Sequence, residues 1–200
     1  MKKTSWAAIA LVAVAVSWGG AFVLMKDAID AQPFYDFLAI RFTIATAVMI
    51  LVKPSVLKAF DGPMIKHGIY LGVLLALGYI TQTIGLELST AAITGFITGL
   101  YVVLTPIFGW VIYRKKAGKR LIVGVVLATI ALALISINGV NFEIGQLWVV
   151  LCAFLFAAHI VGLSIWSPGK DVYALTVMQL AVVGAVSWLG AFANDGSYQS

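Results

Sequence analysis

Charged side chains are scarce in this sequence. They make up 10% of its 200 residues, whereas ordinary soluble domains contain about 25%. Hydrophobic residues make up 62%, and the mean hydropathy is +1.04. A water-soluble fold must cover its surface with polar side chains, and this chain has too few of them. The composition therefore excludes an ordinary soluble domain and predicts a protein surrounded mainly by lipid.

Cysteine and enzyme motifs are also lacking. The one cysteine, Cys152, cannot form an internal disulfide, which excludes a disulfide-stabilised scaffold. The sequence contains no H-E-x-x-H or G-x-S-x-G motif, no pair of carboxylates within one apolar run, and no cluster with metal-ligand spacing. It therefore predicts no enzyme activity, no cofactor and no metal site.

The net charge of +5 would suggest a nucleic-acid partner in a soluble protein. Here the basic residues lie in short segments between apolar runs. In that position they are better explained by the orientation of the chain in a membrane. We therefore predict no nucleic-acid partner.

Seven apolar runs are long enough to cross a bilayer, since a helical span needs about 20 residues. They are 6–25, 35–52, 69–86, 92–113, 120–138, 145–166 and 172–193. The runs are continuously apolar, without the alternation typical of barrel strands. The first run resembles a signal peptide, but its length, its lack of a cleavage site and the six later runs favour retention. The predicted fold is all-α, a polytopic transmembrane bundle with seven spans.

Basic residues predict the orientation of these spans. If the spans alternate, one side of the membrane receives Lys2, Lys3, Lys53, Lys58, Lys66, Arg114, Lys115, Lys116, Lys119, Arg120 and Lys170. The other side receives Lys26 and most of the acidic residues. Because cytoplasmic loops are enriched in Lys and Arg, we expect a multi-pass protein of the plasma or inner membrane. Its N-terminus would be cytoplasmic and residue 200 would be outside.

An internal repeat relates the two ends of the sequence. Aligning the sixth run with the first places Gly162 on Gly20, and aligning the seventh with the second places Gln179 on Arg41. Five spans separate the two starting points, and because five is odd, the second copy enters from the opposite face. Inverted repeats of this kind are common in secondary transporters.

The sequence also resembles a known family, the EamA-type members of the drug/metabolite transporter superfamily. The matching motifs are Trp18-Gly19-Gly20-Ala21-Phe22, Phe37-Leu38-Ala39-Ile40-Arg41-Phe42, a stretch from Gly85-Leu86 through Ala91-Ala92-Ile93-Thr94 to Pro106, and Gly124 to Leu134. The resemblance implies a carrier built from two inverted five-helix repeats around a central pathway. It assigns residues 4–138 to the first repeat and 145–200 to a second, incomplete one.

The same resemblance implies transport of small organic metabolites, such as amino acids, nucleosides or drug-like molecules, by alternating access and often outward. The partners would be the lipid bilayer and a small-molecule substrate. Because the second repeat is short, we expect either a missing C-terminal half or pairing with another copy. The alternative is a non-transporting membrane scaffold or subunit that associates with a partner chain.

Four hydroxyl side chains follow one helical face of the run 92–113. They are Thr94, Thr98, Tyr101 and Thr105, at positions i, i+4, i+7 and i+11. Because lipid offers hydroxyls no partners, this face should line a cavity, unless the threonines bond their own i−4 carbonyls and only pack. Pro106 removes a backbone hydrogen bond, which predicts a kink there.

Two polar side chains inside other runs are further candidates. Arg41 lies well within the run 35–52, where an arginine costs about 2.5–3.5 kcal/mol at the bilayer centre and less near its edge. It either extends outward, towards Glu87, or binds an anionic group of the substrate. Gln82 must find partners because its amide lies in hydrocarbon. It either lines the pathway or bonds one helix to another.

His159 and the end of the first run complete the candidate site. His159 lies near the middle of the run 145–166, where it either exchanges a proton during transport or is held neutral by a neighbouring helix. Trp18 and Gly20 belong to a flexible, partly polar segment along which the pathway of the resembled family would run.

Overall fold

The computed structural model describes residues 2–113, 118–119, 122–127, 130, 134 and 144–194. Within these ranges the regular elements are all helical and no strand occurs. The elements are α1 (Lys2–Ala31), α2 (Phe34–Val52), the short 3₁₀ helix η1 (Pro54–Ala59), α3 (Gly62–Glu87), α4 (Ala91–Thr98), α5 (Tyr101–Tyr113), α7 (Ile144–Trp166) and α8 (Val172–Asn194). The predicted all-α fold is confirmed.

Six segments of the described residues are long and apolar enough to cross a membrane. They are Val12–Ala31, Phe34–Val52, Gly62–Glu87, Ala91–Ile112, Ile144–Trp166 and Val172–Asn194. Each corresponds to a predicted span, and the remaining predicted span, 120–138, lies mostly outside the described residues. The polytopic helical membrane protein expected from the sequence is confirmed, with six spans in place of seven in the part that the structure covers.

The first span ends later than predicted, because α1 continues through a polar turn to Ala31 instead of ending at residue 25. Lys26 supports this extension, since its ammonium group lies 3.6 Å from the carboxylate of Asp30 one turn later. The helix ends just before Pro33, which lacks an N–H and disfavours helical geometry in the residue before it. Local helix signals therefore set this boundary, and hydropathy alone misplaced it.

Short polar side chains cap the N-termini of α3, α4 and α8. Asp61 accepts a hydrogen bond of 2.7 Å from a backbone N–H of the first turn of α3, and Thr90 does the same for α4 at 3.3 Å. Asp171 accepts from two backbone N–H groups at the start of α8. Each cap satisfies N–H groups that the helix leaves unpaired, which lipid could not do.

The fourth span is broken at Gly99–Leu100, between α4 and α5, whereas Pro106 lies inside α5. The sequence did not predict this break, and the kink expected at Pro106 stays a prediction. At the break the backbone tightens to i→i+3 bonds, such as the 3.0 Å bond from Leu100 N to Ile97 O. Glycine lowers the cost of such an irregular backbone.

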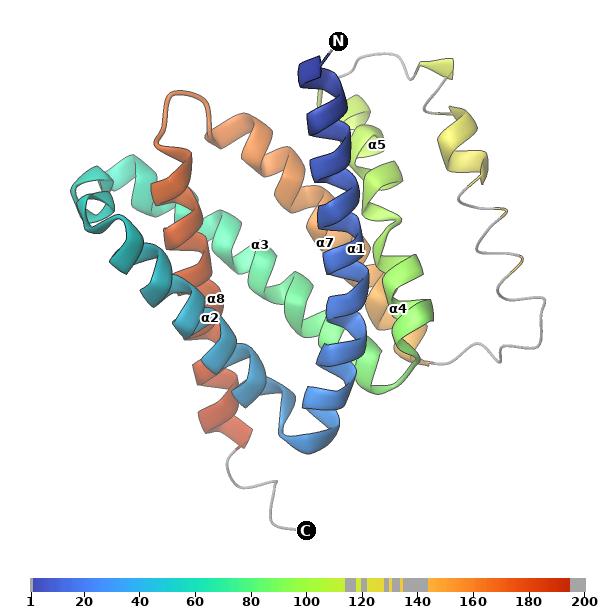
Figure 1. Ribbon diagram of the computed structural model, residues 1–200, viewed down its shortest axis with the longest axis horizontal. Coiled ribbons are helices and arrows are strands. Elements are labelled where there is room, and N and C mark those ends of the chain that lie inside the picture. Colours follow the sequence, from blue (N-terminus) through green and yellow to red (C-terminus); the bar gives the residue numbers. More distant parts are fainter. Residues whose placement is uncertain are drawn as a thin grey trace.

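Helix α3 lies at the centre of the packing (Figure 1). It packs along both α7 and α8, which make few contacts with each other, and α8 also packs against α2. Glycine permits this close approach: a Cβ atom added at Gly72 would lie 2.6 Å from Val182 on α8. Because lipid removes the usual hydrophobic driving force between helices, association depends on such close packing.

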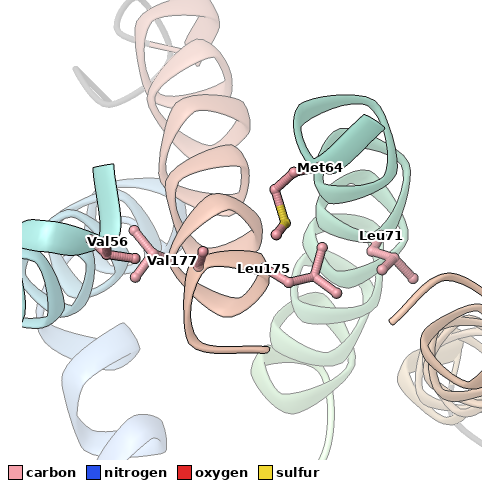
Figure 2. Close-up of a cluster of buried hydrophobic side chains, with 6 residues drawn as sticks. Val56, Met64, Leu71, Leu175 and Val177 are labelled. Atoms are coloured by element: carbon pink, nitrogen blue, oxygen red, sulfur yellow. The ribbon is translucent and has the colours of Figure 1, made fainter. Parts of the chain in front are cut away.

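A buried apolar cluster joins η1, α3 and α8 at one end of the bundle. Figure 2 shows its labelled members, Val56, Met64, Leu71, Leu175 and Val177, gathered from the three elements. Close by, Lys53 forms an ion pair of 3.1 Å with Asp171, so the segments after α2 and before α8 meet there. These segments carry basic residues that the sequence places on one side of the membrane.

The helices alternate in direction, so that the start of α1 and the end of α8 lie at opposite ends of the bundle (Figure 1). At the end opposite Lys53, Lys26 donates to the backbone oxygens of Leu86 and Glu87 at 3.1 and 3.0 Å. The prediction that the basic residues lie on one side of the membrane depends on this alternation.

Candidate functional site

A cavity of about 440 Å³ lies between α1, α2 and α3. Helix α1 forms one wall, which includes Ser17 and Trp18; α2 contributes Arg41, and α3 contributes Tyr79 and Gln82. We call it the Arg41 cavity. Its other lining residues are small or apolar, as is usual for pockets in which a few polar groups fix the orientation of a ligand.

A second cavity, of about 220 Å³, lies between α1, α3, α5 and α7. We call it the His159 cavity, since it is lined by His159 together with Tyr101 and Phe156. Trp18 and Tyr79 line both cavities, so the two are neighbours with a shared aromatic boundary. Five of the nine predicted site residues line one or both cavities: Trp18, Arg41, Gln82, Tyr101 and His159.

Arg41 is surrounded by aromatic rings. Its guanidinium carbon lies 5.3 to 5.9 Å from three ring centroids, and its Nη1 donates to the sulfur of Met25 at 3.6 Å. The rings belong to Phe37, Phe42 and Tyr79. Among the described residues no carboxylate lies within 4.0 Å of Arg41, and the expected extension towards Glu87 does not produce an ion pair.

Gln82 combines the two roles considered for it. Its side chain is 1% exposed, and its Nε2 donates to Thr98 Oγ1 at 3.3 Å, which joins α3 to α4. The residue also lines the Arg41 cavity. A buried amide that makes one bond between helices still has polar atoms available for a ligand.

The four hydroxyls that were expected to share one helical face have different surroundings. Tyr101 faces the His159 cavity, whereas Thr98 accepts from Gln82. Thr105 donates to the carbonyl of Tyr101 at 2.6 Å, which is the i−4 bond of the packing alternative. Thr94 is fully buried, and its hydroxyl has no hydrogen-bond partner among the described residues. The break at Gly99–Leu100 explains this difference, because the helical register does not continue through it.

His159 is held by a neighbouring helix. Its Nε2 lies 2.6 Å from Gln179 Oε1, and Gln179 in turn donates through Nε2 to the carbonyl of Leu175 at 3.0 Å. Since that bond fixes which end of the amide is the oxygen, Nε2 of the histidine is the donor. His159 is thus joined to a neighbouring helix, and it also borders the His159 cavity.

Trp18 and Gly20 differ in what surrounds them. The Trp18 ring stacks on Tyr101 with centroids 6.0 Å apart, so α1 meets α5 at the boundary of the cavities. Gly20 lines neither cavity, and a Cβ added there would meet no atom within 4 Å. Nothing in the described residues requires glycine at this position.

Tyr79 and Phe156 are site residues that the sequence analysis missed. Tyr79 lines both cavities and contacts Arg41, and Phe156 packs edge-on against it with centroids 5.4 Å apart. A signal for Tyr79 existed, since it lies three residues before Gln82 and therefore on the same helical face. Phe156 lies in an apolar run where nothing distinguishes it from residues that face lipid.

Polar groups at membrane depth usually mark a functional site, and here they surround cavities within a bundle of spanning helices. The sequence profile of the EamA-like transporter family matches residues 5–137. The chain belongs to this family, and the resemblance seen in its motifs is confirmed.

Two curated relatives carry transporter names. A protein of Archaeoglobus fulgidus named "Uncharacterized transporter" is 36% identical over 165 residues, which cover 82% of this chain and 51% of the relative. The "Uncharacterized transporter YetK" of Bacillus subtilis is 23% identical over 194 residues, which cover 95% of this chain and 59% of the relative. The chain thus spans about half the length of these relatives. No solved structure matches it.

Proposed function

We propose that this protein carries small organic metabolites, such as amino acids, nucleosides or drug-like molecules, across the plasma or inner membrane, in the outward direction. The observation that supports this most directly is the pair of adjacent cavities that share Trp18 and Tyr79. Together they reach helices from both ends of the sequence, as expected of a site between two repeats.

The proposed mechanism is alternating access between two inverted repeats, 4–138 and 145–200. One repeat rocks against the other and exposes the site to each side in turn. The packing of α8 against α2 and α3 supplies the contact about which such motion would occur. We propose a cytoplasmic N-terminus and an external residue 200, because this orientation places most basic loops inside.

The second candidate function is that of a scaffold or subunit bound to another copy or another chain. It is favoured by the low burial of α1 and α2, in whose spans only 18% and 17% of residues are buried. Their remaining surface is available to a partner helix as well as to lipid.

Flux through reconstituted vesicles tests these alternatives. The full chain is placed in proteoliposomes and offered a panel of labelled amino acids, nucleosides and small organic acids. A carrier gives saturable flux, which Gln82→Leu or Tyr79→Phe changes, whereas Thr176→Val does not. Thr176 is the control because it lines neither cavity and its hydroxyl is bonded to its own i−4 carbonyl. Absence of flux for the whole panel, with a folded chain that co-purifies with a partner, would support the scaffold.

A further inference from the structure

The Arg41 cavity contains one charge and nothing that neutralises it. Arg41 carries the one formal charge among the residues that line the two cavities, and none of them is Asp or Glu. His159 is the other lining residue that can carry a positive charge. The nearest partners of the guanidinium are aromatic faces and one methionine sulfur. A cation at membrane depth is normally paired or placed in a water-filled cavity. The Arg41 guanidinium is therefore available to pair with an anionic ligand that enters the cavity.

The geometry around Arg41 leaves its hydrogen-bonding capacity largely unused. Rings that lie 5.3 to 5.9 Å from the guanidinium carbon hold the group by cation–π attraction. They do not accept its N–H groups as an oxygen would, and sulfur at 3.6 Å is a weak acceptor. A guanidinium has five N–H donors arranged to bind a carboxylate with two parallel bonds. The Arg41 guanidinium is therefore held in place with N–H donors that are available to bind one carboxylate.

The rest of the cavity specifies what may accompany that carboxylate. The polar lining groups besides Arg41 are neutral, namely Ser17, Tyr79 and Gln82, and the remainder is apolar or aromatic. An ammonium group or a second carboxylate on the ligand would find no countercharge there. The volume of about 440 Å³ lies within the range of pockets that enclose small organic molecules.

The corresponding position in the second predicted repeat carries no charge. Gln179, which aligns with Arg41, is neutral and uses its amide to bond His159 and Leu175. Arg41 is joined to other helices only by a weak hydrogen bond to the Met25 sulfur and by contact with the Tyr79 ring, among the described residues. Its charge is therefore better explained by a ligand than by packing.

We propose that the Arg41 cavity binds an organic monocarboxylate and that Arg41 pairs with the carboxylate. The rest of the ligand would be an apolar group about as large as a phenyl ring. The inference names the substrate class of the transport site and so rests on the proposed function. It distinguishes such acids from cationic or neutral molecules and from dicarboxylates.

Binding to the purified full chain in detergent tests this proposal. The probes are phenylacetate, its neutral amide phenylacetamide, its cationic analogue phenethylamine, and the dicarboxylate phenylmalonate. We expect phenylacetate to bind at least tenfold more tightly than the other three. Arg41→Gln, which copies Gln179, should remove this preference while leaving the weak binding of the amide unchanged, and Arg41→Lys should retain part of it. Lys58→Gln, a charge change on η1 outside both cavities, should have no effect.

The outcomes separate this inference from the transport function. Equal binding of acid and amide, or a preference that survives Arg41→Gln in a chain that is still folded and monodisperse, overturns the inference. Flux of a neutral or cationic solute without acid binding also overturns it but leaves transport intact. Acid binding that depends on Arg41, without flux in vesicles, supports the inference and contradicts transport.

Discussion

The α1–α2 hairpin and the α7–α8 hairpin, which we predict to be corresponding parts of two repeats, have different surroundings. In the spans of α7 and α8, 44% and 39% of residues are buried, against 18% and 17% in α1 and α2. The reason is α3, which packs along both helices of the second hairpin but makes few contacts with the first. The polar residues differ accordingly: Gln179 is bonded on both sides of its amide, whereas Arg41 faces a cavity. Close packing satisfies a polar group, and loose packing leaves it available to a ligand.

The largest effect that would test this comparison is overpacking at the central helix. Gly85→Leu on α3 would bring its Cβ against Val149 and to 2.8 Å from the carbonyl oxygen of Gly145 on α7. We expect a loss of about 3 kcal/mol of stability or failure to fold, because a backbone atom cannot move aside. Thermal unfolding in detergent measures it. The matched control is Gly20→Leu on α1, where a new Cβ meets nothing; a loss there would show that α1 is packed as tightly as α3.

The buried pair of the second hairpin should give the next largest effect. His159→Ala leaves the Gln179 carbonyl without its 2.6 Å donor, which costs about 1–3 kcal/mol. Because the two residues share one bond, His159→Ala and Gln179→Leu together should cost less than the sum of the single changes. Arg41→Gln in the other hairpin should change stability by less than either. A full double-mutant cycle measures this, and additive costs would contradict the direct bond.

Two threonines of one helix should respond in opposite directions. Thr94→Val replaces a buried hydroxyl that has no partner among the described residues, so we expect stability to rise by about 1 kcal/mol. Thr98→Val removes the acceptor of Gln82 and should lower stability by a similar amount. Chemical unfolding of both variants under the same conditions measures the two changes in stability. A destabilising Thr94→Val would mean that this hydroxyl has a partner in the membrane.

The smallest expected effect concerns the ion pair that joins the two hairpins. The hydrogen bond from Lys53 lowers the pKa of Asp171 below its usual value of 3.8, and the backbone N–H of Ala174 acts in the same direction. A lowered pKa adds stability that is present above the usual value and lost as the pH falls through the lowered one. The stability gap between the wild type and Asp171→Asn should therefore be constant near neutral pH and close below about pH 4. A gap that does not narrow as the pH is lowered below the usual pKa of Asp would contradict this origin.

Much of the fold follows from hydropathy, because a helix that must cross hydrocarbon needs a long apolar run. This rule located the span of α2 almost to the residue and the spans of α7 and α8 as well. It fails where a polar turn continues a helix, as in α1. It also cannot place the break in the fourth span, which falls at Gly99–Leu100 between α4 and α5.

The candidate site is harder to predict from the sequence than the fold is. Arg41, Gln82 and His159 stand out because polar groups in apolar runs are costly, and each lines a cavity. Tyr79 could be found only through Gln82, because it lies three residues before it on the same helical face. Which hydroxyl of the fourth span faces a cavity depends on the break between α4 and α5, which helical periodicity cannot anticipate.

The partition between the two cavities has a kinetic consequence. Trp18 and Tyr79 border both of them, so the partition is formed by rings and not by main chain. Rotation of a side chain is faster than collective motions of helices, which take microseconds to milliseconds. For the transport that we propose, we therefore expect the tilting of helices, and not the rotation of these rings, to set the turnover rate.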